Sequence, residues 1–390
     1  MKKGYNLTSK NTYRRSPIKI LFLTNGGSQF DRRVIEELRD RGYQVWYVYL
    51  RKAGHQNRIP GVESVYLGYE VTRSEGLLSF RILHRLRAYW RFRRLLKELR
   101  PDILHAGWIQ GPGLMAAVSG YHPFVLMPWG SDILLFPQRS RAFHKITTYT
   151  LNRADGVYCD AQLVRERIKT FKDFDDDRIV VFPCAANLEI FQRKQEARDA
   201  IRAELGWQDN PILIMTRNLE HIYGIESFLE SLPFLLESVP EARVLILGSG
   251  SLADKAQNFI SSLGLGEKVR MLGRVPNVRI PEYLSAADLY VSNSISDGTS
   301  MSLIEAMACS LPVVVTDIPA NKEWVVDGVN GRLVGTNDPN ALASTMIQLL
   351  ADEETRKQYA NRNLEIAQNR ANWKVNFGKL EELYTNVLDL

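Results

Sequence analysis

Short runs of aliphatic and β-branched residues alternate along this 390-residue chain with longer segments of helical period. That alternation predicts parallel βαβ units, because strands buried on both faces are continuously apolar and are joined by helices. In the first half we expect strands at 18–24, 44–49, 102–105, 124–127, 156–159 and 179–182, with a helix near 30–41. In the second half we expect strands at 212–216, 243–247, 269–272, 289–291 and 312–316. The predicted fold class is α/β, with two Rossmann-like, doubly wound parallel sheets.

A polar stretch at 192–210 interrupts the strand rhythm and predicts a domain boundary. A length of 390 residues also exceeds what one hydrophobic core usually organises. We therefore expect a first domain over 18–192 and a second over 193–372. The segment 1–17 carries five Lys or Arg and no acid, and it lacks the apolar stretch of a secretory signal. We expect it to be a disordered basic tail of a cytoplasmic protein.

Composition narrows the class of protein further. Hydrophobic residues make up 45% of the chain and charged residues 24%, and no apolar run is long enough to cross a bilayer. The net charge of +6 is too small to indicate a general nucleic-acid-binding protein. The spacing of Cys159, Cys184 and Cys309 fits neither a disulfide framework nor a zinc site, so buried free thiols are expected.

Candidate chemistry is expected in the loops after the strands, because ligands of such sheets bind beyond the carboxyl ends of the strands. Arg217 and Asn218 follow the strand at 212–216. A guanidinium at that position suits two oxygens of a diphosphate, and the alternative is a surface arginine that pairs with a carboxylate.

Gly248 and Gly250 follow the strand at 243–247 in a pattern like a dinucleotide fingerprint. The acidic residue that should close the next strand is missing, since that strand ends in Gly273 and Arg274. NAD is therefore not expected, and we expect the glycines to shape a turn beside another ligand.

The segment 297–305 is the most informative part of the chain. Asp297 and Gly298 precede the start of an expected helix, and Glu305 lies eight positions after Asp297. Free amides at a helix start attract phosphate, while the two carboxylates can face a nucleotide sugar along one side of the helix. The alternative is that Asp297 caps the helix and Glu305 is an ordinary solvated helix residue.

This segment resembles the pattern of glycosyltransferase family 4, in which an acid is followed by seven residues, Glu-Ala-Met, a small pair and Pro-Val-Val over 297–314. The similarity continues over about 212–350, and weaker elements resemble the family at 41–45, 101–106, 129–132 and 183–191. The resemblance implies the GT-B fold, in which two Rossmann-like domains face a central cleft. It also implies retaining transfer from a nucleotide-diphosphate sugar, with a UDP-sugar favoured, and a segment 373–390 that crosses back onto the first domain.

The resemblance also implies a role for each residue that matches the family's motifs. Glu305 would bind ribose, Asp297 the donor sugar and Arg217, with Asn218 beside it, the diphosphate. The remaining donor-site residues would lie in loops of both halves: Gly26, Gly27, Tyr223, Gly248, Gly250, Gly273, Arg274, Val275, Gly298, Thr299, Ser300, Met301 and Ser302.

Three positions depart from the family pattern. Asp297 stands where a glutamate is usual, Tyr223 where a lysine is usual, and Trp129 where a histidine is frequent. Losing the lysine removes one cation from the diphosphate site, and Arg274 or Lys322 is a candidate to replace it.

The chemistry implied needs stabilisation of a leaving diphosphate more than it needs a nucleophile. The leaving phosphate can accept the proton of the acceptor, and His105 or Asp132 can orient the hydroxyl. The alternative is that His105 is a structural histidine at a strand end.

No cofactor and no metal are expected, since the acidic run 173–177 lies away from the phosphate candidates. A nucleotide-sugar epimerase and a catalytically impaired scaffold remain alternatives.

A basic segment at 80–100 holds eight Lys or Arg and one Glu. Its helical period predicts an amphipathic helix with Trp90 and Phe92 interleaved and an apolar stripe made of Leu78, Ile82, Leu86, Tyr89, Leu96 and Leu99. One interpretation is an ordinary helix that packs on its sheet. The other is an anionic membrane surface as partner, on the inner face of the plasma membrane, where a lipid-linked or other saccharide acceptor would be met.

Overall fold

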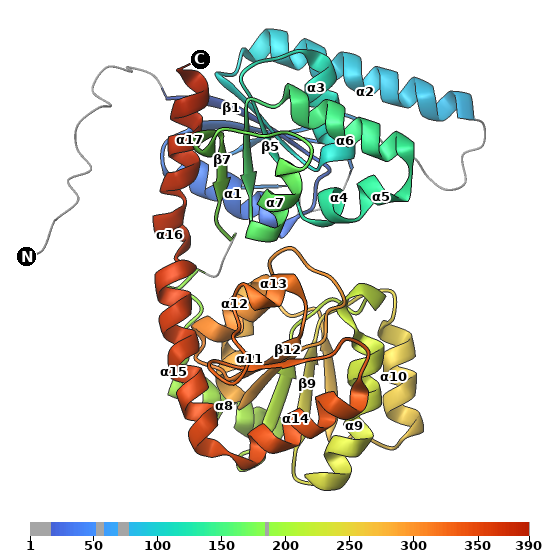
Figure 1. Cartoon of the computed structure of the whole chain (residues 1–390), viewed down its shortest axis with the longest axis vertical. Helices are drawn as coiled ribbons and strands as arrows, with labels where there is room; N and C mark the ends of the chain where they lie inside the picture. The colour runs from blue at the N-terminus through green and yellow to red at the C-terminus, as the bar shows by residue number, and fades with distance from the viewer. Residues whose placement is uncertain (1–16, 52–57, 69–77, 184–186, 390) are drawn as a thin grey trace, which may run out of the picture. The chain divides into compact units, whose positions relative to one another are not determined.

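The computed structural model describes residues 17–51, 58–68, 78–183 and 187–389. The chain divides into two compact units (Figure 1). The first contains the residues up to Tyr158 together with 167–180 and 381–390, and the second contains 159–166 and 181–380. The expected basic tail, apart from Pro17, and Cys184 lie outside the described residues.

The first unit is built on a seven-stranded sheet in the order β3-β2-β1-β4-β5-β6-β7. The strand pairs from β3 to β6 are parallel. The strands are β1 (Lys19–Thr24), β2 (Gln44–Tyr49), β3 (Glu63–Tyr66), β4 (Ile103–Gly107), β5 (Phe124–Met127), β6 (Gly156–Cys159) and β7 (Ile179–Val181). The helices of this part of the chain are α1 (Gln29–Asp40), α2 (Leu78–Leu99), α3 (Leu114–Ser119), α4 (Ser131–Leu134), α5 (Phe136–Arg139), α6 (Arg141–Arg153) and α7 (Gln162–Lys169).

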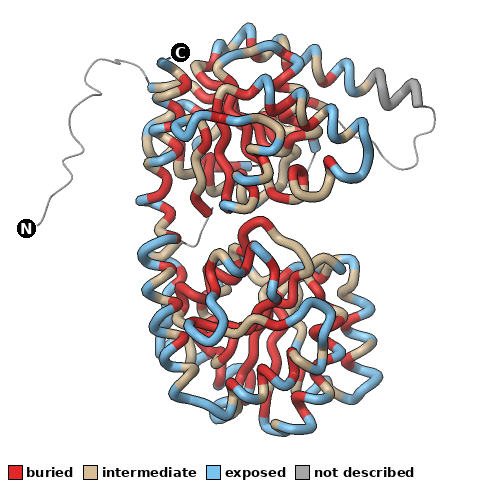
Figure 2. The backbone as a smooth tube through the Cα atoms, in the orientation of Figure 1, coloured by how far each residue is buried: buried red, intermediate tan, exposed pale blue. Residues whose placement is uncertain are grey.

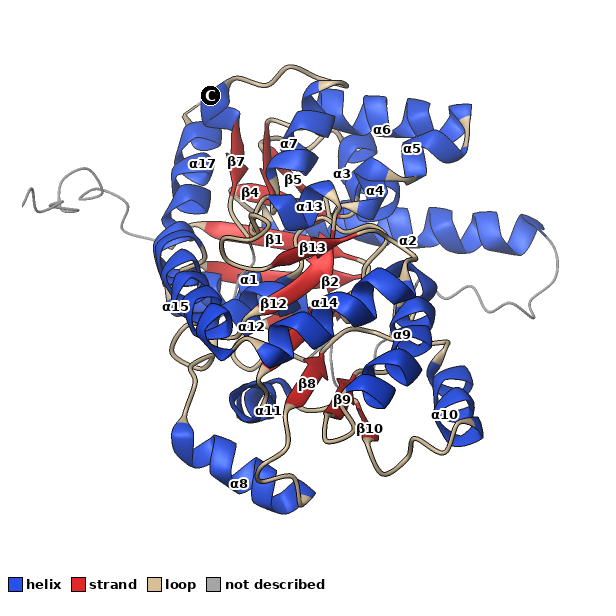
Figure 3. Ribbon diagram, turned by 60° about the horizontal axis from the view of Figure 1, so that its bottom comes forward, coloured by secondary structure: helices blue, strands red, loops and turns tan. Residues whose placement is uncertain are grey.

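The second unit contains a six-stranded parallel sheet in the order β10-β9-β8-β11-β12-β13 (Figure 3). Its strands are β8 (Ile212–Met215), β9 (Arg243–Leu247), β10 (Val269–Gly273), β11 (Leu289–Ser292), β12 (Val313–Thr316) and β13 (Arg332–Val334). The helices that follow β7 are α8 (Gln195–Leu205), α9 (Ile225–Ser238), α10 (Ala253–Ser262), α11 (Ile280–Ala286), α12 (Met301–Ala308), α13 (Pro319–Lys322), α14 (Pro339–Ala351), α15 (Glu353–Arg370), α16 (Trp373–Asn376) and α17 (Gly378–Leu388).

Both faces of the second sheet are buried, and β8 shows why its sequence is continuously apolar. Ile212 and Ile214 belong to the core cluster on one face, whereas Leu213 and Met215 belong to the cluster on the other. Successive side chains of a strand point to opposite faces, so both faces require apolar residues. Figure 2 shows the resulting buried layer along the strands. The predicted α/β class with two doubly wound sheets is confirmed.

Two strands were not predicted from the sequence, β3 and β13. Each lies at an edge of its sheet and pairs with a single neighbour, and they contain four and three residues. An edge strand needs fewer apolar residues, so its pattern is weaker than that of a central strand.

The end of the chain belongs to the first unit. Gly156 in β6 has no side chain, and a Cβ there would lie 2.8 Å from Leu383 and 3.0 Å from Val387 of α17. Glu381 of the same helix accepts hydrogen bonds from Arg41 at 2.6 Å and from Tyr43 at 3.1 Å. Apolar packing and a charged pair therefore both attach this helix to the unit.

The apolar stripe of α2 differs from the predicted one. Ala88, Phe92 and Leu96 are buried, while Leu86 is 50% exposed and Trp90 is 67% exposed. Phe92 was expected among the interleaved aromatic residues and Leu86 in the stripe, so both assignments were wrong. The buried face is narrower than the predicted stripe and contains one small residue, Ala88. The large apolar side chains of Leu86 and Trp90 are therefore exposed to solvent.

No helix in the described ranges is both long and apolar enough to span a membrane. Cys159 and Cys309 are buried thiols that form no disulfide in the described part of the chain, as expected. Burial raises the pKa of both thiols, so they remain protonated.

A charged cluster attaches α8 to the second sheet. Asp288 accepts hydrogen bonds from Arg198 at 2.7 Å, from Arg202 at 2.6 Å and from the amide of Ile212 at 2.9 Å. Arg202 is 6% exposed and also donates to the carbonyl oxygens of Ala286, Gln208 and Asn210. One carboxylate thus joins two arginines to the first residue of β8.

Asp288→Ala is expected to lower the free energy of unfolding of the second unit by about 3–5 kcal/mol, because it leaves a buried guanidinium without its counter-charge. Urea unfolding followed by circular dichroism measures this loss. The matched control is Asp209→Ala, an exposed acid in the loop after α8, which should change the value by less than about 0.5 kcal/mol. Equal effects of the two substitutions would contradict the assignment.

Candidate functional site

The order of the strands indicates where each sheet can bind a ligand. In the first sheet β1 lies between β2 and β4, and in the second β8 lies between β9 and β11. The connections from these central strands run in opposite directions, which opens a crevice at the carboxyl ends of the strands. The relevant loops therefore follow β1, β4, β8 and β11, and each unit is described by itself below.

Arg217, in the loop after β8, is the centre of a polar cluster in the second unit. It is 8% exposed. One terminal nitrogen donates to the hydroxyls of Ser300 at 2.9 Å and Ser302 at 3.1 Å, and the other donates to the Asp297 carboxylate at 2.5 Å. Its Nε–H has no hydrogen-bond partner among the described residues. The structure thus brings together four of the predicted site residues.

Two tyrosines complete the surroundings of this guanidinium. The Tyr223 ring lies 4.1 Å from the central carbon of the Arg217 guanidinium, a cation–π contact. Tyr290 in β11 donates a hydrogen bond to Ser302 at 2.9 Å. Burial lowers the pKa of Arg217, but Asp297 and the tyrosines more than offset it, so the pKa is raised overall. Sequence analysis missed Tyr290, because a tyrosine inside a buried strand carries no sign of the helix residue that its hydroxyl reaches.

The helix start after β11 is organised differently from the predicted alternative. Ser300, and not Asp297, caps α12 and accepts the amide of Leu303 at 3.3 Å. Asp297 accepts the amide of Gly298 at 3.0 Å and pairs with Arg217. Glu305 is 5% exposed and therefore is not a solvated helix residue. Gly298 and Thr299 are buried beside it, and Met301 is half-buried.

Gly248 and Gly250 serve close packing of backbone. A Cβ at Gly248 would lie 2.0 Å from the carbonyl oxygen of Arg217, and one at Gly250 would lie 2.3 Å from that of Leu219. No side chain fits at either position. These glycines position the loop that carries Arg217, and their expected place beside a ligand has no support in these contacts.

The other predicted residues of the second unit lie around this cluster with varied exposure. Gly273 accepts the amide of Gly248 at 2.8 Å, and nothing lies within 4 Å of where its Cβ would be. Val275 is half-buried, and Asn218 and Arg274 are exposed. Lys322, the other candidate to replace the missing lysine, pairs with Asp317 at 2.5 Å.

In the first unit, the loops after β1 and β4 hold the remaining predicted residues. Gly26 and Gly27 have φ of 96° and 78°, a region that favours glycine, and the Gly26 amide donates to the Thr24 hydroxyl at 3.0 Å. Asp132 is fully buried and accepts the amides of Ile109 at 2.9 Å and Trp129 at 2.8 Å. Its contacts with backbone fix the two loops that carry Trp108 and Trp129.

His105 lies inside β4 and not at the strand end. It is fully buried, its Nδ1 lies 2.5 Å from the Tyr384 hydroxyl of α17, and its ring lies 4.4 Å from that of Phe22. Burial lowers the pKa of His105 to about 3, so the ring is neutral. The structure therefore does not bring His105 together with the other predicted residues, and a structural role in packing α17 accounts for it.

Asp31, in the first turn of α1, is a residue that sequence analysis did not select. It is fully buried, and neither carboxylate oxygen has a hydrogen-bond partner in the described part of the chain. Burial raises the pKa of Asp31 to about 8, and the Thr24 hydroxyl lowers it only in part. Its place one turn after the Gly26–Gly27 pair was the available signal, but an acid there is common as a helix-dipole partner.

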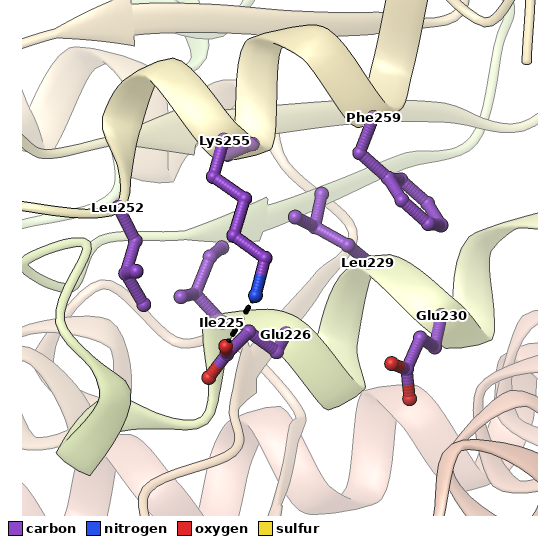
Figure 4. A pocket seen from close by; sticks show the side chains of 8 residues that line it. Ile225, Glu226, Leu229, Glu230, Leu252, Lys255 and Phe259 are labelled. Carbon is purple, nitrogen blue, oxygen red and sulfur yellow. Dashed lines mark hydrogen bonds and ion pairs between the residues drawn. The ribbon is translucent and has the colours of Figure 1, made fainter. Parts of the chain in front are cut away.

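A cavity of about 50 Å³ lies between α9 and α10 in the second unit (Figure 4). Apolar side chains of both helices and the Lys255–Glu226 ion pair line it. Ligand pockets are usually several times larger, and none of the predicted site residues lines this cavity. It is a small, partly open hollow between two helices.

Two parallel α/β sheets, each with polar residues gathered at the carboxyl ends of its central strands, define the GT-B class of protein. The family described as Glycosyl transferases group 1 matches residues 197–365, and the family Glycosyl transferase 4-like matches residues 19–161. The chain belongs to the group 1, family 4-like glycosyltransferases.

Individual relatives agree with this family. TuaC of Bacillus subtilis, assigned to teichuronic acid biosynthesis, is 30% identical over 267 residues, which are 67% of this chain and 63% of that protein. A phosphatidyl-myo-inositol mannosyltransferase of Mycobacterium leprae is 31% identical over 177 residues, 45% of this chain and 46% of that protein. The chain thus matches between about half and two thirds of the length of these relatives.

Solved structures share the fold. HepE of Anabaena, solved in complex with UDP, superposes with a TM-score of 0.77 at 19% identity and covers 95% of this chain and 100% of its own. Sucrose-phosphate synthase of Thermosynechococcus elongatus gives 0.78 at 17% identity, covering 95% and 99%. The expected GT-B fold is confirmed.

Asp31→Asn is expected to stabilise the protein increasingly as the pH rises from about 5 to 8. The folded state keeps a proton that the unfolded chain releases above its ordinary pKa of 3.8, so ionisation costs the wild type up to about 1.4 kcal/mol per pH unit in this window. Below pH 4 this penalty is absent, and above pH 8 it is constant. Tyr47 and Thr24 face the carboxyl, and burial keeps the Tyr47 pKa far above this range.

Melting temperatures of the two proteins, measured side by side from pH 5 to pH 8.5, give the difference. A difference that does not change with pH would show that Asp31 is not protonated in the folded state.

Proposed function

We propose that this chain is a retaining, metal-independent glycosyltransferase that transfers a hexose from a UDP-sugar to a glycan or lipid-linked saccharide in polysaccharide or envelope biosynthesis. It would act in the cytoplasm, at the inner face of the plasma membrane. The relatives support the class of reaction: HepE was solved with UDP and glucose, and TuaC is assigned to teichuronic acid biosynthesis. The observation that carries the proposal is the buried Arg217 with one N–H left over.

Arg217 suits a diphosphate because its donors are already arranged. Ser300 and Ser302 hold one edge of the guanidinium, and the Tyr223 ring covers a face of it. The unpartnered Nε–H is a buried donor whose desolvation cost is relieved when a phosphate oxygen accepts from it. Tyr223 thus takes a different role from the usual lysine: it orients the one guanidinium and adds no second charge.

The start of α12 supplies the rest of the donor site. The amides of Thr299, Ser300 and Met301 face the sugar and phosphate, and the buried Glu305 carboxylate binds the ribose hydroxyls. Asp297 contacts the donor sugar. Arg217 pairs with Asp297 in the free protein, and donor binding shares the guanidinium between carboxylate and phosphate.

The transfer itself proceeds on one face of the sugar. The bond between the anomeric carbon and the phosphate oxygen breaks while the acceptor oxygen forms its bond on the same face. The acceptor proton passes to the leaving phosphate oxygen, so the reaction balances without a protein base. Arg217 and the helix amides stabilise the charge of the leaving group. Asp132 positions the loop of Trp129, and His105 takes no part.

Arg217→Ala is expected to weaken UDP binding at least tenfold, because it removes a charge-assisted hydrogen bond worth about 1.5–3 kcal/mol. Thermal shift with increasing UDP gives the apparent Kd of each variant, since a ligand that binds only the folded state raises its stability.

Two controls make this test specific. Tyr223→Phe keeps the ring on the guanidinium and should retain UDP binding, and Arg279→Ala removes an exposed arginine of the same unit and should also leave it unchanged. Absence of any shift with UDP or with other nucleoside diphosphates in the wild type would refute the donor assignment.

The exposed face of α2 supports the membrane part of the proposal. Leu86 and Trp90 lie one turn apart, and Arg87, Arg94 and Lys97 are exposed beside them. These five residues fall within about 100° around the helix, opposite the buried face with Ala88, Phe92 and Leu96. An exposed tryptophan among cations fits the headgroup region of an anionic bilayer, where each cation contributes about 1 kcal/mol.

Co-sedimentation with vesicles of phosphatidylglycerol and phosphatidylcholine tests this surface. The wild type should bind the anionic vesicles, and the triple variant Arg87→Glu, Trp90→Ala, Arg94→Glu should lose at least tenfold in affinity. The control, Arg141→Glu with Lys145→Glu on α6, changes charge by the same sign on exposed residues of the same unit and should bind as the wild type does. Binding that ignores the lipid charge would exclude this surface.

A further inference from the structure

The turn that carries Tyr223 is held by contacts from outside its own segment. It consists of a short 3-10 helix, His221–Tyr223, and of Gly224, which precedes α9. The amide of Tyr223 donates to the carbonyl oxygen of Glu220 at 2.9 Å, and the amide of Gly224 donates to that of His221 at 3.0 Å. Hydrogen bonds of a 3-10 helix are poorly aligned, and this helix has only these two. A neighbouring element is therefore needed to fix the Tyr223 ring.

The loop after β11 is that neighbouring element. The amide of Ile295 in this loop donates to the carbonyl oxygen of Ile222 at 2.8 Å. The side-chain amide of Asn293 donates to the carbonyl oxygen of Gly224 at 3.3 Å. Gly224 has a φ of 64°, and a Cβ there would lie 1.9 Å from the backbone oxygen of Asn293. The turn and the loop are thus in direct contact and are joined at two places.

Asn293 supplies the side-chain part of this contact at a cost. It is 1% exposed, and its Oδ1 atom has no hydrogen-bond partner in the described part of the chain. A buried polar atom without a partner destabilises the folded state, so an apolar side chain of similar size would serve packing better. The amide nitrogen and its bond to Gly224 are therefore what this side chain contributes.

The loop is itself anchored to the next strand of the sheet. The Thr316 hydroxyl at the end of β12 donates to the carbonyl oxygen of Ser294 at 2.5 Å, and the side-chain amide of Asn321 donates to the Thr316 hydroxyl at 3.2 Å. All three residues are at most 1% exposed. A buried network whose donors and acceptors match is rigid. Asn293, which is adjacent to Ser294, therefore extends from a fixed base.

The same loop also reaches Arg217 directly. Asp297 follows Asn293 by four residues and pairs with the guanidinium, while the Tyr223 ring covers its face at 4.1 Å. Because Asn293 attaches the turn of Tyr223 to the loop of Asp297, the ring and the carboxylate meet Arg217 in one arrangement.

We infer that Asn293 is a positioning residue, whose hydrogen bond to Gly224 holds the Tyr223 ring on Arg217 and so sets the direction of the guanidinium that meets the diphosphate. The inference rests on the proposed function, because it assigns a further residue to the same donor site. Asn293 acts only through the ring and contacts no part of the donor. Its effect on donor binding should therefore disappear when the ring is absent.

A double-mutant cycle on the full chain tests this dependence. Asn293→Ala and Tyr223→Leu should each raise the apparent Kd for UDP, measured by thermal shift, about fivefold, because a buried cation–π contact is lost. The double variant should bind UDP only as weakly as Tyr223→Leu does, since both substitutions remove the same contact. The matched control is Asn258→Ala, which removes an exposed amide on α10 and should leave the Kd unchanged.

A second measurement involves no nucleotide. In the full chain labelled with ¹⁵N-arginine, the Nε–H resonance of Arg217, identified by its absence in Arg217→Ala, responds to the ring current of Tyr223. Asn293→Ala should move this resonance from its wild-type position toward its position in Tyr223→Leu. Lower stability alone does not change the surroundings of this N–H in the folded protein, so the resonance separates positioning from a merely structural role.

Each outcome decides one assignment. Additive effects of the two substitutions on UDP binding would overturn the inference, and so would an Arg217 resonance that stays at its wild-type position in Asn293→Ala. If UDP does not stabilise even the wild type, the proposed donor site fails, while the resonance still decides whether Asn293 holds the ring. If Asn293→Ala does not fold, Asn293→Ser replaces it, because the shorter side chain leaves its hydroxyl farther from the Gly224 carbonyl.

Discussion

The guanidinium of Arg217, which is only 8% exposed, determines how the loops after β8 and β11 are arranged in the second unit. An unpaired buried charge costs several kcal/mol, so acceptors must converge on Arg217 from other elements. They come from the loop and helix after β11, as the Asp297 carboxylate and the hydroxyls of Ser300 and Ser302. The same contacts fix the start of α12, so compensating the buried charge and shaping the loop after β11 are one constraint.

Close backbone packing is what makes this convergence possible. The loop of Arg217 passes so near the turn after β9 that Gly248 and Gly250 have no room for a Cβ. On its other side, a Cβ at Gly224 would lie 1.9 Å from the carbonyl oxygen of Asn293. A glycine pattern that resembles a dinucleotide fingerprint is thus explained by the position of an arginine, without a dinucleotide.

The sequence was sufficient to predict the central strands and to select the loops that carry the candidate site residues. Strands such as β9 and β5 are buried on both faces, and their continuous apolar runs gave the observed bounds. The edge strands β3 and β13 gave no such pattern.

Within the site, motif spacing identified Arg217 and Asp297, but their pairing and the hydrogen bond from Tyr290 to Ser302 depend on tertiary contacts between strands. The exposed face of α2 was predicted wrongly for a similar reason, because periodicity alone does not show that Ala88 and Phe92 define the buried face.

Three fully buried titratable residues of the first unit show why burial alone does not identify function. His105 meets the Tyr384 hydroxyl through Nδ1, while its Nε2 has no hydrogen-bond partner in the described part of the chain, and Asp132 accepts two backbone amides. Asp31 meets neither a cation nor an amide in the described part of the chain. Depth alone therefore does not distinguish these residues, whereas their hydrogen bonds do, since only Asp132 of the three has both of its side-chain polar atoms held by backbone amides.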